Sequence, residues 1–219
     1  MGNNQFECRP IYPNRQYGLW TTQFKDDDLK FLWDEVNAIQ DANFNREENP
    51  DVRHTQIGHL QHEYALTDET KDQLDKLLAP LVKVQLEQNQ AWNYRYAMCD
   101  KDLPIKLQST WVNFQQKYEY NPIHHHTGIF SFVLWLKIPY NKEDEANCPH
   151  TPKENLNGNF HSFFLDQFGV ISDMFIPLDS SYENTCLIFP CDLKHCVYPF
   201  YTSDEYRISV SGNFAYQTS

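Results

Sequence analysis

The second half of the chain contains six short segments rich in β-branched and aromatic residues, and this pattern constrains the fold most. The segments are 105–118, 129–138, 161–165, 170–176, 185–189 and 206–214. Each is bounded by Pro, Gly, Asn or Asp, which favour turns. No helical pattern lies between them, so they predict antiparallel sheets. We therefore expect a mainly β (α+β) fold with a jelly roll or barrel at its core.

Two amphipathic helices are expected in the first half of the chain. The composition of 9–24 is typical of one or two short strands that begin the sheet. A helix is predicted over 26–40, where an acidic first turn precedes apolar residues at helical spacing. A second is predicted over 67–86, with a kink expected at Pro80. Each has a single apolar stripe, so both should buttress one face of the sheet.

The length of 219 residues predicts one domain over 1–219. Residues 1–100 would supply the N-terminal strands and supporting helices, and 105–216 the β core. The polar segment 41–62 is interpreted as a loop. The charged segment 139–159 is interpreted as an inserted loop, long enough to serve as a lid. A homodimer contact through one of the helices is an open alternative.

Charge and hydropathy exclude several classes of function. The net charge of −12 repels phosphate backbones, so we expect no nucleic-acid partner. The longest nearly apolar run has eight residues, too few to span a membrane. The first residues lack an export or lipidation signal, and reduced cysteines are expected. These features predict a cytoplasmic protein, and the Asn-rich composition hints at a phage-encoded protein in a host cytoplasm. The cysteine spacing is not that of a zinc site.

Three consecutive histidines lie between two apolar strands and suggest a metal site. In an extended segment, His124 and His126 point to the same face and His125 points away. Two such imidazoles can converge on one ion. His195, which follows another apolar run, is the natural third ligand. Imidazole suits Fe, Zn, Cu and Ni, so the residues leave the metal open. The alternative is a solvated loop, or an incidental site without function.

A polar stripe on the last predicted strand suggests a receptor for an anion. Arg207, Ser209 and Ser211 alternate with Ile208 and Val210, so the polar set points to one face and the apolar set to the other. An Arg that points into a barrel is costly unless it meets an anion, and its planar fork fits a carboxylate. A structural Asp or Glu partner is the alternative interpretation.

From Trp111 to Phe214 the sequence resembles the iron(II)- and 2-oxoglutarate-dependent oxygenases, and within them a bacterial and phage group. The resemblance rests on Trp111-Val112-Asn113, on 121–128 (NPIHHHTG) leading to Ser131, on 187–190 with His195 and Val197, and on Arg207-Ile208-Ser209 with Asn213. It covers about the last half of the chain. The spacing from His195 to Arg-x-Ser is its most specific element.

The resemblance implies a double-stranded β-helix with an oxygenase site. By it, His124, His126 and His195 would bind Fe(II). Arg207 and Ser209 would hold the far carboxylate of 2-oxoglutarate, and Asn113 would line the cavity beside it. The implied activity is that of an oxidoreductase, a dioxygenase that hydroxylates an unknown protein, peptide or small molecule with O2 and releases succinate and CO2.

One feature departs from the family pattern. Most members carry a carboxylate where His126 stands, as His-x-Asp or His-x-Glu. Either the site is all-histidine, or a carboxylate arrives from elsewhere, with Asp166 and Glu119 nearest in sequence. A cupin-like three-histidine metalloenzyme without 2-oxoglutarate is therefore a second hypothesis, and a non-catalytic jelly-roll binding module is a third. The position of Arg207 discriminates between the first two, because only the oxygenase requires it to face the metal cavity.

Overall fold

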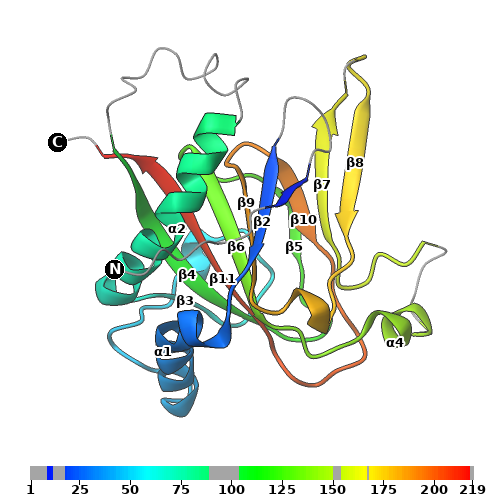
Figure 1. The fold of residues 1–219 in the computed structure, drawn as a ribbon. Coiled ribbons are helices and arrows are strands. Elements are labelled where there is room, and N and C mark those ends of the chain that lie inside the picture. The colour runs from blue at the N-terminus through cyan, green and yellow to red at the C-terminus, as the bar shows by residue number, and fades with distance from the viewer. Residues whose placement is uncertain (1–8, 12–17, 89–103, 150–153, 167, 218–219) are drawn as a thin grey trace.

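The computed structural model describes residues 9–11, 18–88, 104–149, 154–166 and 168–217. Two antiparallel sheets face each other in these residues (Figure 1). The seven strands of the large sheet are, in spatial order, β1 (Arg9–Ile11), β2 (Leu19–Gln23), β9 (Thr185–Pro190), β6 (Phe130–Lys137), β11 (Arg207–Tyr216), β4 (Ile105–Gln115) and β3 (Glu63–Ala65). The four strands of the small sheet are β5 (Asn121–His124), β10 (Lys194–Val197), β7 (Phe160–Leu165) and β8 (Ile171–Ile176). This arrangement is the jelly-roll core that the sequence predicts.

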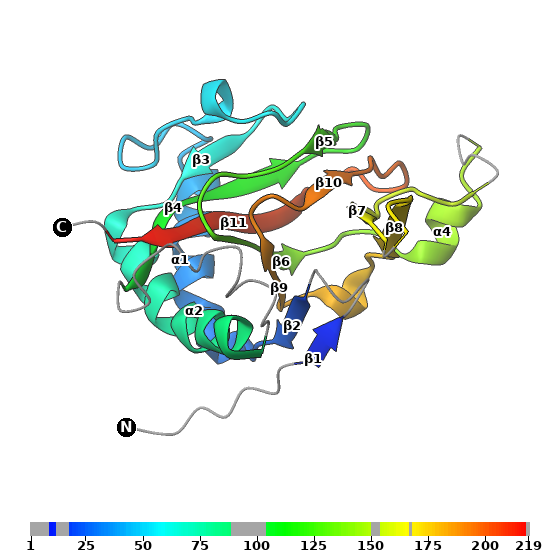
Figure 2. The same ribbon diagram turned by 90° about the horizontal axis from the view of Figure 1, so that it is seen from above.

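The two predicted helices are confirmed, with small changes at their ends. A 3-10 turn (Asp26–Leu29) leads into α1 (Lys30–Asp41), and α2 (Asp68–Gln88) runs through Pro80. Both lie on the outer side of the large sheet, and β5 and β10 lie on its inner side (Figure 2). None of the described helices is both long and apolar enough to cross a membrane.

Apolar residues fill two separate layers. The larger cluster lies between the helices and the outer face of the large sheet, where Leu32 and Leu74 meet Val112, Phe114 and Val210. The smaller cluster lies between the two sheets and includes residues of β6, β7 and β9. Burial of these surfaces stabilises the fold and leaves one end of the space between the sheets for polar side chains.

Several short elements differ from the sequence prediction. Strand β4 ends at Gln115 rather than at 118, and the inserted segment 139–159 contains a one-turn helix, α4 (Lys142–Ala146). The predicted loop 41–62 contains a 3-10 turn (Arg53–Thr55) and is followed at once by β3. The pattern also missed β5 and β10, because four residues are too few to show an alternation. Both matter, since they carry the histidines.

Candidate active site

A cavity lies between the two sheets and is lined by polar side chains from both. The small sheet and the turn after β5 contribute His124, His126 and His195. The large sheet contributes Arg207 and its neighbours. The remaining polar lining residues are Gln56, Glu63, Asn113, Gln115, Asn121, Ser209 and Ser211. The structure thus brings the histidines and the arginine to one cavity, as the oxygenase hypothesis requires.

Strand pairing brings the three histidines together. His124 on β5 is the direct cross-strand partner of His195 on β10, and their ring centroids are 4.2 Å apart. His126 follows β5, and its backbone N–H donates to the carbonyl of Cys191 at 2.7 Å. One ring nitrogen of each histidine lies within 4.8 Å of the others. The ring of His125 is outside this group, is exposed, and has its Nδ1 2.8 Å from Lys194 Nζ.

Backbone carbonyls orient two of the imidazoles. His124 Nδ1 lies 2.7 Å from the carbonyl of Pro122, and His195 Nδ1 lies 2.9 Å from the carbonyl of Leu193. A carbonyl can only accept, so each Nδ1 carries the proton and each Nε2 presents a lone pair to the cavity. Burial lowers the pKa of all three rings, that of His126 to about 3. The imidazoles are therefore neutral at physiological pH, which is the form that binds metal.

The spacing of the nitrogens fits a single transition-metal ion. The Nε2 atoms of His126 and His195 are 3.3 Å apart. Two nitrogens at this separation subtend about 100° at an ion that lies about 2.1 Å from each. Aromatic rings close the site on two sides, with Trp111 stacked on His126 and Phe160 stacked on His195. The three histidines thus fit a single transition-metal ion, and the two aromatic rings would limit its contact with water.

No carboxylate joins the three histidines within the part of the chain that the structure describes. Asp166 accepts the backbone N–H groups of Phe168 and Val170 in the exposed turn between β7 and β8. Glu119 accepts the backbone N–H groups of Gln61 and Gln116. Of the two alternatives left open by the sequence, the geometry favours the all-histidine set.

Arg207 enters the cavity from β11 and is held by neutral partners. Its side chain is 2% exposed. One terminal nitrogen, Nη1, donates to the Tyr140 hydroxyl at 2.7 Å and to the carbonyl of Gly158 at 2.8 Å. The other, Nη2, donates to the side-chain oxygen of Gln115, whose own amide donates to the Glu119 carbonyl at 2.6 Å. These bonds fix the plane of the guanidinium.

The charge of Arg207 is not neutralised by any carboxylate among the described residues, whose ion pairs all involve other cations. The hydrogen bonds to protein atoms leave its Nε–H and one Nη2–H without a described acceptor. A buried cation without a counter-ion is costly. The described residues thus contain no structural Asp or Glu partner of the kind considered from the sequence, and the site is suited to an anionic ligand.

Ser209 and Asn113 lie next to Arg207 on the same face of the sheet. They are cross-strand partners on β11 and β4, and both line the cavity. The Asn113 amide donates to the hydroxyls of Ser209 at 3.4 Å and Ser211 at 3.5 Å. The buried side-chain oxygen of Asn113 has no hydrogen-bond partner within the described ranges. A ligand that reaches from the histidines to Arg207 would pass these hydroxyls.

The structure also shows residues in or beside the cavity that the sequence did not reveal. Tyr140 anchors Arg207, although its position before the inserted segment gave no sign of this role. Glu63 is a buried cavity residue on an edge strand, directly after the segment interpreted as loop. Trp111 belongs to one of the motifs that resemble the family, but the sequence did not indicate that it lies beside His126. These residues reach the site from separate segments of the sequence, so no local pattern could have found them.

Comparisons with known proteins agree with this architecture. Residues 109–213 match a family model described as "Putative 2OG-Fe(II) oxygenase". No curated protein matches the sequence. A prolyl-4-hydroxylase from Pseudomonas putida is similar in structure, with a TM-score of 0.53 and 17% identity over 93% of this chain and 94% of that one. The non-heme alpha ketoglutarate dependent epimerase SnoN from nogalamycin biosynthesis has a TM-score of 0.51 and 13% identity over 93% of this chain and 78% of that one. At these identities the structural likeness concerns the fold.

Proposed function

Because the chain belongs to the iron(II)- and 2-oxoglutarate-dependent oxygenase superfamily, we propose that it is a dioxygenase that hydroxylates a protein, peptide or small molecule. In the overall reaction, 2-oxoglutarate and O2 convert a C–H bond to C–OH, and succinate and CO2 are released. O2 is the oxidant, and bound Fe(II) together with 2-oxoglutarate would activate it. The protein supplies binding, orientation and exclusion of water.

The three histidines would hold the metal through their Nε2 atoms. His124 and His195 are oriented by backbone carbonyls, so little ordering is needed when the ion binds. An all-imidazole set is neutral and leaves the full charge of Fe(II) in place. It therefore attracts an anionic cosubstrate more strongly than a set with one carboxylate would.

The unneutralised charge of Arg207 is the observation that carries the proposal. If a molecule bound at the histidines carries a second acid group at its far end, that group would accept hydrogen bonds from the remaining N–H groups of Arg207. Ser209 lies on the way and would donate its hydroxyl to that carboxylate, with the Asn113 amide holding the hydroxyl. 2-Oxoglutarate has this form, with a 2-oxo acid at one end and a carboxylate at the other.

The all-histidine set is also what the cupin-like alternative predicts, so the histidines alone do not discriminate. That alternative needs no carboxylate receptor in the cavity. The presence of Arg207 in the same cavity as the histidines favours the oxygenase.

Anaerobic titration tests the proposal. Metal-free protein would receive Fe(II) and then 2-oxoglutarate, while the visible charge-transfer band of the chelated cosubstrate is recorded. We expect the band in the wild type and its loss in His195→Ala. Arg46→Met, outside the cavity lining, is a control that should leave the band unchanged. Iron binding without a band would contradict the oxygenase and favour the cupin-like enzyme.

A further inference from the structure

Five carboxylates are buried among the described residues, and four of them are fully supplied with donors. Glu35 accepts from Asn49 and Thr67, and Asp75 accepts from Lys106 and the backbone of Leu107. Glu119 accepts two backbone N–H groups, and Glu145 accepts the backbone and hydroxyl groups of the segment 201–202. This is the normal condition of a buried carboxylate, because desolvation without hydrogen bonds is costly.

Glu63 is the fifth, and it is the exception. The residue is 2% exposed, and its Oε2 is fully buried with no hydrogen-bond partner in the part of the chain that the structure describes. No donor to its other oxygen is present among the described residues. Glu63 lines the same cavity as the histidines and Arg207. It is also the cross-strand partner of Asn113, which in turn pairs with Ser209. Glu63 therefore lies on the edge strand, one strand beyond the residues that we assign to the cosubstrate.

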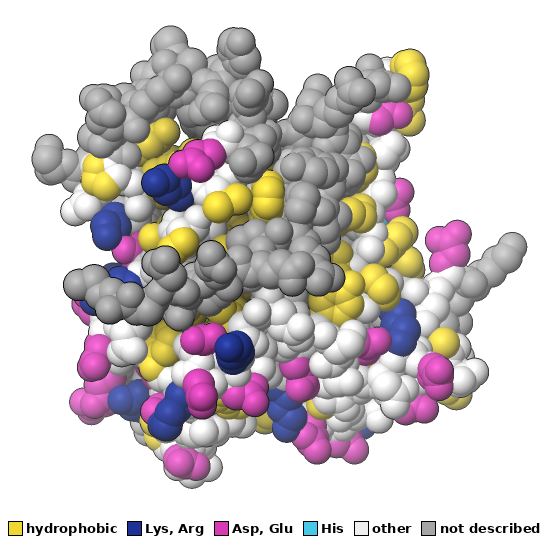
Figure 3. Space-filling model, in the orientation of Figure 1, with side chains coloured by type: hydrophobic (Ala, Val, Ile, Leu, Met, Phe, Trp, Pro, Cys, Tyr) yellow, Lys and Arg dark blue, Asp and Glu magenta, His cyan; other side chains and the backbone are white. Residues whose placement is uncertain are grey.

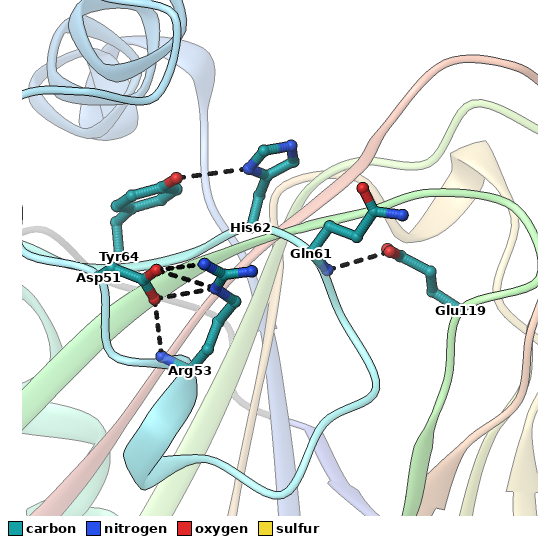
Figure 4. Close-up of polar contacts among 6 residues, drawn as sticks. All are labelled: Asp51, Arg53, Gln61, His62, Tyr64 and Glu119. Carbon is teal, nitrogen blue, oxygen red and sulfur yellow. Dashed lines mark hydrogen bonds and ion pairs between the residues drawn. The ribbon is translucent and has the colours of Figure 1, made fainter.

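The charged neighbours of Glu63 are already engaged elsewhere. Arg53 holds Asp51 through a 2.6 Å ion pair, and Glu119 accepts the backbone N–H of Gln61 (Figure 4). Burial, and next the charges of Asp51 and Glu119, raise the pKa of Glu63 to about 7. The surroundings of Glu63 are thus negatively charged. No lysine or arginine among the described residues forms an ion pair with its carboxylate.

Two further acceptors in the cavity have the same deficiency. The side-chain oxygens of Asn113 and Asn121 are buried and have no hydrogen-bond partner among the residues described, and both side chains line the cavity with Glu63. Acceptors without donors indicate that the group which fills this space brings donors of its own. The net charge of −12 favours a positive ligand over a neutral one. Acidic and basic side chains are interspersed over the lower part of the face in Figure 3.

We propose that Glu63 recognises the prime substrate, and that this substrate carries a cationic nitrogen, as an ammonium or a guanidinium group. This inference rests on the proposed function, because it places the cation beside the cosubstrate. Glu63 would accept from the cation, with Asn113 and Asn121 adding neutral acceptors. Arg207 and Glu63 would then divide the cavity by charge, one binding the acid of the cosubstrate and the other the base of the substrate.

Calorimetry with matched probes tests the proposal. The protein, saturated with Fe(II) and 2-oxoglutarate under nitrogen, would be titrated with Nα-acetyllysinamide and Nα-acetylargininamide. Their neutral counterparts are Nα-acetylnorleucinamide and Nα-acetylcitrullinamide. We expect the cationic probe of at least one pair to bind tenfold or more tightly than its neutral counterpart. Glu63→Gln should abolish the preference, and Glu119→Gln, a buried glutamate outside the lining, should retain it.

The outcomes separate this inference from the proposed function. Absence of a cationic preference in the wild type, or its persistence in Glu63→Gln, would overturn the role of Glu63. The charge-transfer band with 2-oxoglutarate should form equally in wild type and Glu63→Gln. A wild type that shows the cationic preference but no band would support Glu63 as a cation site and overturn the oxygenase.

Discussion

The two faces of the large sheet are built from the same strands but differ in chemistry. On β4, Val112 and Phe114 point outward into the apolar layer under the helices, whereas Asn113 and Gln115 line the cavity. On β11, Val210 points outward between the cavity residues Ser209 and Ser211. The apolar side chains of the outer face are packed against those of the helices. The inner face retains a cation, a carboxylate and amide oxygens without complementary partners in the described residues.

This difference separates stability from function. Apolar side chains on the outer face lose water and gain close contacts, so each contributes to folding. Buried polar groups without partners do the opposite and persist where a ligand completes them. Substitutions on the two faces should therefore have opposite effects on stability and on ligand binding.

The largest effect on stability is expected on the outer face. Phe114 is fully buried and packs edge-on against Phe44, Tyr64 and Tyr206. Phe114→Ala should lower the free energy of unfolding by about 3–5 kcal/mol, through lost burial and a residual cavity. Chemical denaturation measures this loss, and 2-oxoglutarate affinity of the remaining folded protein should be unchanged. A strong loss of affinity in the folded fraction would mean that the two faces are not independent.

On the inner face, Glu63→Gln should stabilise the protein without substrate. The raised pKa of Glu63 means that the unfolded carboxyl ionises near 4.5 and the folded one near 7. Between these values the folded state holds more protons, so stability falls as pH rises. The loss amounts to about 3 kcal/mol when complete.

Denaturation of wild type and Glu63→Gln from pH 4 to pH 8.5 checks the sign. The variant should gain stability over the wild type as pH rises through this window, while Glu47→Gln, at an exposed position, should show no such gain. A Glu63→Gln variant that is less stable at pH 8 would show that a donor satisfies the carboxylate in the folded protein.

The smallest effect is expected at Ser209. Its hydroxyl receives only a long hydrogen bond, 3.4 Å, from Asn113. Ser209→Ala should lower 2-oxoglutarate affinity about fivefold, equivalent to about 1 kcal/mol, through one lost hydrogen bond. Stability should change by less than about 0.5 kcal/mol. Titration of the charge-transfer band measures the first, and an affinity equal to that of the wild type would remove Ser209 from the site.

The sequence predicted those features of the site that depend on the alternation of side chains along one strand. Arg207 and Ser209 were expected to share a face because residues two apart do so in any strand. The same rule gave the common direction of His124 and His126. The helices followed from a single apolar stripe at helical spacing.

Features that depend on pairing between distant segments were not predictable. Glu63 reaches the cavity because β3 pairs with β4 in one register, and a shift of one residue would turn it to the other face. Tyr140 meets Arg207 across 67 residues of sequence. Glu119 was considered as a metal ligand from its place in the sequence alone, and backbone N–H groups hold it elsewhere.

The most direct test of the proposed cosubstrate site compares 2-oxoglutarate with 2-oxopentanoate. The second compound has the same 2-oxo acid group but lacks the far carboxylate. Both would be titrated anaerobically into wild type and Arg207→Met loaded with Fe(II). We predict that the wild type binds 2-oxoglutarate about 100-fold more tightly, the equivalent of roughly 3 kcal/mol for a buried charged pair. The variant should bind both equally. Equal affinities in the wild type would contradict the assignment of Arg207 as the carboxylate receptor.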